Sequence, residues 1–200
     1  MSCVFSRRTG SILALIAGVF LWPAIGAAQT VNGQAAAVQA TVFNLFGSTA
    51  LGLASTGTLG GTTDARDASQ LSGNLLGALV AEVPQATTIG WPDQVSSQAS
   101  LANLSLNIAG SNISADFLSS EAMANLNAGG SGSSILTNLQ LNGTPVTVNG
   151  APNQAIAIPG GRIVVNEQQP SPGGIVVTAL HVVVGGVADV MIGTATAGIQ

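Results

Sequence analysis

The run from Ile175 to Val184 reads IVVTALHVVV and is rich in β-branched residues. Its apolar side chains fall on both alternating faces, which is typical of a central strand that is buried on both sides. Gly185-Gly186 ends the run, and the sequence QQPSPGG at 168–174 before it is expected to form a loop. The chain therefore predicts a buried strand at the centre of a sheet.

Shorter alternating runs before and after this stretch predict more strands and hairpins. Residues 102–108 and 113–117 alternate apolar with polar side chains around Gly110-Ser111-Asn112, and Asn142-Gly143 separates two further apolar pairs. Both patterns are typical of β-hairpins, since Asn and Gly accept the positive φ of a tight turn. Pro145 cannot donate a ladder hydrogen bond, so we expect it at a strand start or an edge. Other strands are expected at residues 34–46, 155–158, 162–165 and 188–192, with 194–199 as an extension of the last.

Three segments interrupt this strand pattern. Four apolar residues recur at a spacing of four before Pro84 and favour a short helix there: Leu71, Leu75, Leu79 and Val83. Residues 54–63 and 128–134 are rich in small and polar residues and are expected to form loops or turns. Many short strands with frequent turns predict an all-β fold, either β-sandwich-like or a rolled antiparallel sheet. An irregular β-solenoid is the alternative, although no fixed repeat length runs along the chain.

The first 28 residues are typical of a secretory signal peptide. An arginine pair at 7–8 precedes the apolar run SILALIAGVFL at 11–21, and small residues follow. The apolar run is shorter than the roughly 20 residues of a membrane span, so a retained anchor is the weaker alternative. We expect Sec-type export with cleavage after Ala28, or after Ala27 as the close second. A single β-rich domain would then span residues 29–200, and no stable membrane span would remain.

Charge is scarce throughout the chain. Only 6% of its residues are charged, against about 25% in an average domain, and all four cationic residues are arginine. Without a basic footprint, nucleic acid is not expected as a partner. After cleavage the chain keeps two Arg against eight acids, a formal charge of 2 − 8 = −6, and it has no Cys because Cys3 lies in the signal. No disulfide and no thiol nucleophile are therefore expected.

The carboxy-terminal part of the chain resembles a known bacterial family. The matching strings are SGSSILTNLQLNGTPV (131–146), GAPNQAIAIPGG (150–161), IVVNEQ (163–168), VTALHVVV (177–184) and ADVMIGTATAGI (188–199). They are similar to the secreted proteins grouped as the choice-of-anchor P family, and Asn166-Glu167 and Ala179-Leu180-His181 carry most of the likeness. The resemblance implies export and a cell-surface or extracellular role, and it implies no catalytic activity. Family members end in carboxy-terminal sorting signals, whereas this chain stops at Gln200 without an apolar tail.

His181 is the single histidine and the first candidate for chemistry. One interpretation is a general base or metal ligand, and its concrete form is a hydrolase that pairs His181 with Glu167 or Asp189. No G-x-S-x-G motif supports that form. The other interpretation is a core or half-buried histidine bonded to Glu167 or Asn166, because a buried ring nitrogen needs a partner. Strict alternation would place His181 on one face with Ile175, Val177, Ala179 and Val183.

Other candidate sites have weaker support. Asp116 and Glu121 are close in sequence but would lie on opposite faces of one strand unless a bulge intervenes. Trp91 follows Gly90 and precedes Pro92, so it lies at a turn, where capping the core is favoured over stacking on a ligand. One His without Cys does not make a typical zinc site, and no calcium or phosphate motif occurs. We therefore predict no catalytic, cofactor-binding or metal-binding residues.

The sequence predicts an exported, non-enzymatic protein with a structural, cell-surface or extracellular role. It would be secreted or held at the cell surface, with the periplasm as the alternative compartment. Its expected partners are a surface polymer or another extracellular protein. A carbohydrate- or surface-ligand-binding β module is the first alternative function, and a hydrolase using His181 is the second.

Overall fold

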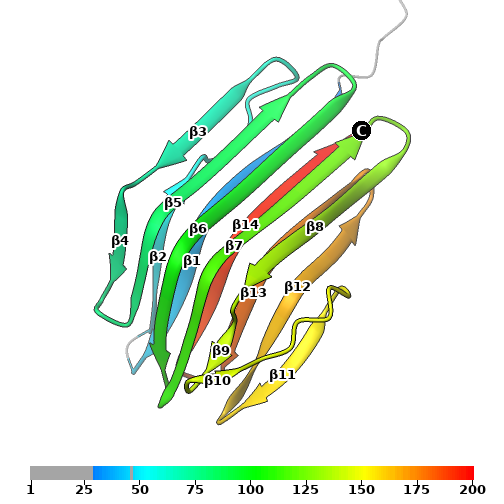
Figure 1. The fold of residues 1–200 in the computed structure, drawn as a ribbon. Coiled ribbons are helices and arrows are strands. Elements are labelled where there is room, and N and C mark those ends of the chain that lie inside the picture. The colour runs from blue at the N-terminus through cyan, green and yellow to red at the C-terminus, as the bar shows by residue number, and fades with distance from the viewer. Residues whose placement is uncertain (1–28, 46) are drawn as a thin grey trace, which may run out of the picture.

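The chain folds into two antiparallel β-sheets that lie face to face (Figure 1). The computed structural model describes residues 29–45 and 47–200, and these residues form fourteen strands and no helix. The signal peptide predicted for residues 1–28 lies outside the described residues. The prediction of an all-β, sandwich-like fold is confirmed. All strand pairs are antiparallel, unlike the parallel coils of a solenoid.

One sheet has six strands and the other has eight. In spatial order the six-stranded sheet contains β11 (Gln154–Ile158), β12 (Gly161–Ser171), β13 (Gly174–Val184), β14 (Ala188–Ile199), β1 (Val31–Asn44) and β2 (Gly47–Ser55). The path of the eight-stranded sheet is β10 (Thr144–Pro145), β9 (Gln140–Leu141), β7 (Ser111–Asn125), β6 (Gln94–Ile108), β5 (Leu79–Gly90) and β3 (Ala65–Ser69). Two further strands flank this path, β4 (Ser72–Leu75) beside β5 and β8 (Gly129–Thr137) beside β7.

The strands that alternation predicted are present, and the predicted hairpins form. β13 is an interior strand of its sheet, as expected for the run from Ile175. β6 and β7 are joined at Ala109 and Gly110, both at positive φ (47° and 77°). β9 and β10 are joined at Asn142-Gly143, and Pro145 lies in the outermost strand of that edge. Turn chemistry therefore placed these hairpins correctly.

The helix expected at residues 71–83 is wrong. The segment forms β4, a turn and the start of β5, so that Leu75 pairs with Leu79. Leu76 and Gly77 take positive φ (55° and 70°) and reverse the chain. Gly73 allows β4 to lie directly against Leu53 of the other sheet, where a Cβ atom would overlap the Leu53 side chain. The leucine spacing of four is thus shared between two strands and their turn.

Two expected loops are also partly strand. Residues 129–134 were expected to form a loop but begin β8, because their small side chains let this strand approach the facing sheet. A Cβ atom on Gly130 would lie only 2.6 Å from the backbone nitrogen of Ile175. The segment QQPSPGG continues β12 to Ser171 and turns only at residues 172–173. The loop expected at 54–63 forms after β2 ends at Ser55.

The core between the sheets is aliphatic, with a few bonded hydroxyls. Its largest fully buried side chains include Leu101, Leu118, Ile163, Leu180 and Ile192. Two part-buried hydrogen bonds cross from sheet to sheet: the Ser97 hydroxyl of β6 donates to the Thr196 carbonyl of β14 at 2.6 Å, and Gln168 Nε2 of β12 donates to the Gly132 carbonyl of β8 at 3.0 Å. The buried Thr88 hydroxyl lies 2.7 Å from that of Ser97. These contacts fix the two sheets relative to each other. Among the described residues, no helix has the length and hydropathy that crossing a membrane would need.

Two interior serines give a matched pair of expected effects. We expect Ser97→Ala to lower the free energy of unfolding by about 1–2 kcal/mol, because the Thr196 carbonyl loses its inter-sheet donor. Ser120 is also buried, but its hydroxyl has no hydrogen-bond partner among the described residues. We therefore expect Ser120→Ala to be neutral or to stabilise by about 1 kcal/mol. Urea denaturation of both variants measures the difference, and equal losses would contradict this account of the interior.

Both sheets bend along one transverse line. In the six-stranded sheet the line consists of five residues that face one another across successive strands, here called the bend row: Asn166, Ala179, Gly193, Ala37 and Ala54. Alternate members take positive φ, with values of 51° at Asn166, 63° at Gly193 and 44° at Ala54. At each of these positions two consecutive residues are buried, although alternation would bury only every second one. Along each strand, the side chains that face the core therefore shift by one residue at this line.

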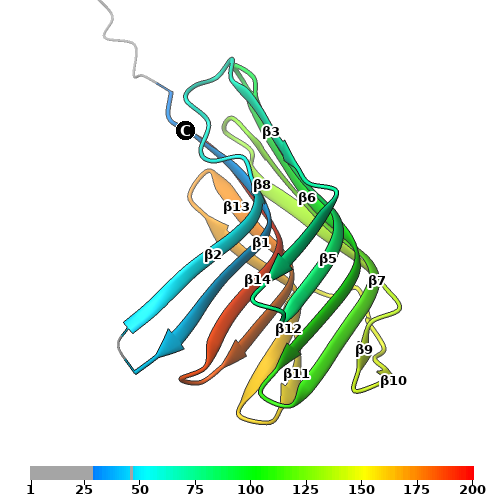
Figure 2. The same cartoon turned by 90° about the vertical axis from the view of Figure 1, so that its left-hand side faces the viewer.

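The eight-stranded sheet bends at the same level, with the opposite burial pattern. Glu82 and Val83 are both exposed, as are Asp116 and Phe117, and Val83 and Asn103 take positive φ (46° and 47°). Two consecutive residues point outward in this sheet where two point inward in the other, so both sheets curve in the same sense. Figure 2 shows the nested bend, with the eight-stranded sheet on the outside. The outer face of the six-stranded sheet is therefore concave.

Candidate functional site

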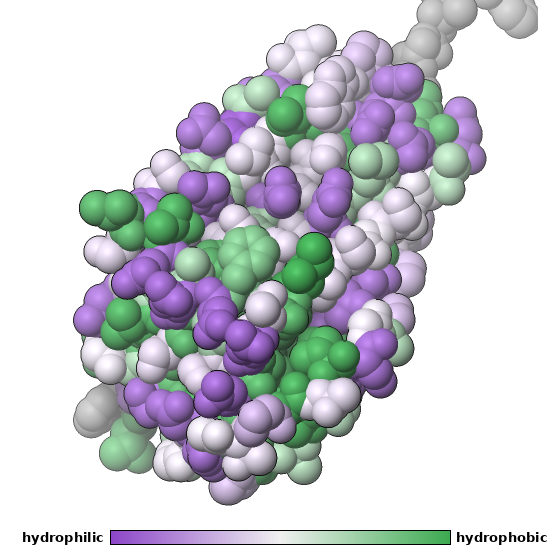
Figure 3. All heavy atoms as spheres, in the orientation of Figure 1, coloured by the Kyte–Doolittle hydropathy of each residue, from purple (hydrophilic) through white to green (hydrophobic). Residues whose placement is uncertain are grey.

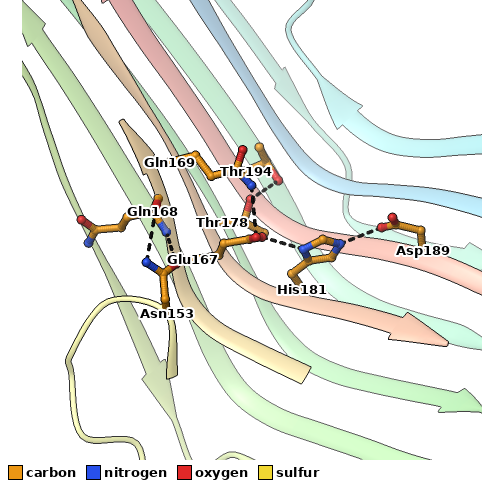
Figure 4. Close-up of polar contacts among 8 residues, drawn as sticks. All are labelled: Asn153, Glu167, Gln168, Gln169, Thr178, His181, Asp189 and Thr194. Carbon is orange, nitrogen blue, oxygen red and sulfur yellow. Dashed lines mark hydrogen bonds and ion pairs between the residues drawn. The ribbon is translucent and has the colours of Figure 1, made fainter. Parts of the chain in front are cut away.

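The concave face carries the histidine cluster that the sequence singled out. His181 lies in β13, between Glu167 of β12 and Asp189 of β14 (Figure 4). Alternation placed His181 on one face with Ile175 and Val177, and this is wrong. The bend row reverses the face at Ala179, so Ile175 and Val177 are buried in the core while His181 is half-buried on the outer side.

Both ring nitrogens of His181 contact carboxylates. Nδ1 lies 2.5 Å from Glu167 Oε2, and Nε2 lies 2.7 Å from Asp189 Oδ1. Gln169 donates from Nε2 to the other oxygen of Glu167 at 3.1 Å. The expectation of a half-buried histidine bonded to Glu167 is confirmed. Asn166, the other expected partner, instead donates to the Gly150 carbonyl at 3.2 Å.

The two carboxylates set the hydrogen-bonding roles of the ring. An ionised carboxylate only accepts hydrogen bonds, and a neutral imidazole has only one N–H. With both carboxylates ionised, the two contacts are satisfied together only when each ring nitrogen donates. The cluster is laid across three neighbouring strands. Its side chains are 14%, 17% and 39% exposed at His181, Glu167 and Asp189, so the pairs are only partly desolvated.

This geometry is unsuited to the hydrolase interpretation. A histidine base needs one free nitrogen to accept the proton of a serine hydroxyl. Neither nitrogen of His181 is free, and no described hydroxyl is bonded to it. The imidazole also fills the space between Glu167 and Asp189, so this carboxylate pair cannot bracket a glycosidic bond. The contacts point to a cluster that ties β12, β13 and β14 together.

The remaining predicted site residues lie apart from the cluster. Trp91 was expected to cap the core, but it is 41% exposed, so that prediction is wrong. Asp116 and Glu121 both point outward from β7, because the strand changes face between residues 116 and 117. Asp116 accepts a hydrogen bond from Asn138 Nδ2 at 2.6 Å. The prediction that these two acids lie on opposite faces is therefore wrong, and the strand changes face without a shift of its register against β6.

A groove lined by both polar and apolar side chains lies beside the cluster on the same concave face. It has a volume of about 210 Å³, and its walls come from β1, β13 and β14. Its lining residues are Gln34, Ala36, Gln39, Val176, Met191, Thr194 and Thr196. Thr194 Oγ1 lies 3.2 Å from Thr178 Oγ1, which continues the polar row toward Glu167 (Figure 4). No sequence motif marked this groove, because the bend row decides which residues share the face.

A second cavity opens at one end of the sandwich and is almost wholly apolar. It has a volume of about 220 Å³ and lies between the two sheets, where the β1–β2, β4–β5, β6–β7 and β13–β14 connections meet. Leu51, Leu76 and Val187 are among its lining residues, and Asn107 is the polar one. On the outer face of the eight-stranded sheet, Figure 3 shows hydrophilic side chains interspersed with hydrophobic ones.

The other ion pair of the described chain anchors a loop. Arg66 Nε donates to Asp64 Oδ2 at 2.9 Å, and the Gly60 backbone nitrogen donates to the same oxygen at 2.7 Å. The Gly60 N–H and then the Arg66 guanidinium hold the pKa of the Asp64 carboxyl below its ordinary value. Asp64 is thus a structural acid that fastens the loop after β2.

Metal binding has no geometric support in the part of the chain that the structure describes. No group of three or more His, Cys, Asp or Glu side chains there is arranged to hold an ion. His181, Glu167 and Asp189 do not converge on a point, because the two carboxylates contact opposite nitrogens of the ring. Comparison of the chain with family models, curated proteins and solved structures gave no match.

Proposed function

We propose that this chain is an exported bacterial protein with a non-enzymatic, structural role at the cell surface or outside the cell. The observation that carries the proposal is the closed histidine cluster. The one histidine, the side chain best suited to acid–base chemistry, has both nitrogens bonded to carboxylates across three strands. The signal-like first 28 residues and the resemblance to the choice-of-anchor P family support export.

Export is tested by fractionation and amino-terminal sequencing of the full chain expressed in a bacterial host. We expect a processed protein that starts at Gln29, or at Ala28, in the periplasm, the medium or the outer-surface fraction. Leu15→Asp, which interrupts the apolar run, should leave the full-length chain in the cytoplasm. An uncut wild-type chain in the membrane fraction would overturn the proposal.

The non-enzymatic part is tested through His181. His181→Gln removes the imidazole ring, with its contacts to both carboxylates, and keeps a polar side chain, so we expect a lower melting temperature and an unchanged cellular role. In a deletion strain, a His181→Gln chain that is exported and folded but fails to restore the phenotype would contradict the structural role. Circular dichroism of the purified variant shows whether it is folded.

A second candidate function is binding of a neutral polar polymer, such as a polysaccharide, on the concave face. The groove lined by Gln34, Gln39, Thr194 and Thr196 favours it, because amides and hydroxyls can exchange hydrogen bonds with sugar hydroxyls. Retention on an insoluble polysaccharide, and its loss in Thr196→Val, would favour this function over a purely structural one.

A further inference from the structure

The expected mature chain, residues 29–200, begins one residue before the hydrogen-bonded part of the fold. Thr30 and Gln200 exchange backbone hydrogen bonds of 2.9 and 3.0 Å, and β1 pairs with β14 from Val31 onward. Gln29 is exposed and makes no hydrogen bond to another described residue. Cleavage after Ala28 therefore leaves Gln29 as an unrestrained terminal residue next to a fixed one.

A glutamine at a free amino terminus contains both groups of a condensation reaction. The α-nitrogen of Gln29 can attack the side-chain carbonyl carbon Cδ of the same residue and close a five-membered ring. The N–Cδ bond forms, the Cδ–Nε2 bond breaks, and Nε2 leaves as ammonia with a proton from the amine. The product is a pyroglutamyl lactam. Because both groups belong to one residue, the step is intramolecular and needs no oxidant, reductant or second substrate.

Ring closure costs the fold no hydrogen bond. The backbone contacts at this end of the β1–β14 ladder use the N–H and C=O groups of Thr30 and Gln200, and the Gln29 nitrogen takes no part in them. The exposed Gln29 side chain belongs to no described core cluster. The lactam can therefore form on the folded protein without disturbing β1.

We propose that Gln29 of the exported chain cyclises to pyroglutamate, so that the mature protein contains no primary amine. The inference rests on the proposed export and on cleavage after Ala28. The sequence has no Lys, because all four cationic residues are Arg, and the α-amine is then the single primary amine of the mature chain. Closing the ring converts this amine to an amide and removes its positive charge.

A chain without primary amines is restricted in how it can be held outside the cell. Covalent attachment through an amine, to a carbonyl of a polymer or to an activated acyl group, needs a nucleophilic nitrogen. The two arginines of the mature chain, Arg66 and Arg162, stay protonated and do not supply one. The protein would therefore be held by its folded surface, or covalently through hydroxyl or carboxyl groups.

The lactam also protects an interior strand from trimming. β1 lies between β14 and β2 in the six-stranded sheet, and it begins at Val31, directly after Thr30. Aminopeptidases bind the free α-ammonium group of their substrate, and removal of Gln29 would expose Thr30 and its bonds to Gln200 to the next cycle. A pyroglutamyl residue has no such group, so degradation from this end cannot begin in that way.

The first experiment is mass spectrometry of the full chain after expression and export in a bacterial host. The exported protein is kept in neutral buffer until its mass no longer changes, then unfolded and treated with an amine-reactive ester. We expect residues 29–200 with a mass lower by about 17 Da, the mass of ammonia, and no label. Gln29→Asn is the matched control, because its shorter carboxamide would have to close a four-membered ring. It should keep its full mass and take one label per chain.

Enzymatic removal of the ring gives a second measurement. Pyroglutamyl peptidase should release the first residue of the unfolded wild-type chain, expose the Thr30 amine and restore one label per chain. A wild-type chain that starts at Gln29 and takes the label without this treatment would overturn the proposal, as would a chain that starts at Ala28. Both results leave the proposed export intact, whereas a chain that keeps residues 1–28 would overturn export as well.

Discussion

Leu180→Ala should remove about 3 kcal/mol from the free energy of unfolding. Leu180 is fully buried in the central strand β13, where it is paired with Val165 on one side and Ile192 on the other. Truncating a buried leucine loses its transfer free energy and leaves a cavity, which together cost about 2–5 kcal/mol. The close packing of three aliphatic strands limits how far the cavity can collapse.

The matched control lies three residues further along the same strand. Val183 is half-buried on the concave outer face, so Val183→Ala should cost less than about 1 kcal/mol. Chemical denaturation of both variants tests the face assignment directly. If Val183→Ala were the more damaging change, the face reversal at the bend row would be incorrect.

Gly130→Ala should be nearly as severe, at about 3 kcal/mol, although it adds one methyl group. A Cβ atom at Gly130 would lie 2.6 Å from the Ile175 nitrogen and would overlap the Gly174 backbone of the facing sheet. Backbone atoms of a paired strand cannot move aside as a flexible side chain can, so the two sheets must separate locally. Ser131→Ala, on the exposed neighbour, provides the control and should be close to neutral.

Thermal denaturation of the two variants measures this difference. A melting temperature for Gly130→Ala equal to that of the wild-type chain would show that β8 does not lie against β13. The close approach of the two sheets at Gly130 also explains why the sequence of segment 128–134 resembled that of a loop. Its glycines are required by the close approach of two sheets, and composition alone does not distinguish that requirement from the demands of a turn.

Local patterns predicted most of the strands and turns of this chain. The hairpins at Gly110 and Asn142-Gly143 follow from residues that accept positive φ, a property of a few neighbouring residues. β13 follows from its β-branched composition in the same way. The helix expected before Pro84 failed because a leucine spacing of four also fits two short strands that meet at a positive-φ turn.

The candidate site was predictable only in part. Glu167 was named with Asn166 as a partner of His181, because a buried ring nitrogen needs a hydrogen-bond partner, although Glu167 lies just beyond the strand predicted at 162–165. The concave face itself was not predicted. Which residues lie on it depends on where the alternation of inward and outward side chains is broken. A signal was present in Asn103 and Asn166, two asparagines inside the long strands β6 and β12, since Asn is among the non-glycine residues that most readily take positive φ. Reading them as bend positions required the register of neighbouring strands.

Because β1 and β14 are neighbours, the fold has low mechanical resistance to a force applied between the start of β1 and the end of β14. β1 and β14 are antiparallel neighbours, and at their outer ends Thr30 and Gln200 exchange backbone hydrogen bonds of 2.9 and 3.0 Å. A force that draws these two ends apart acts across the ladder and loads one rung at a time, so the rungs open in sequence. A force applied between the β2 edge and the far end of β14 would instead load many rungs of the ladder together. A protein of this architecture would therefore resist tension through its sheet edges better than through Thr30 and Gln200.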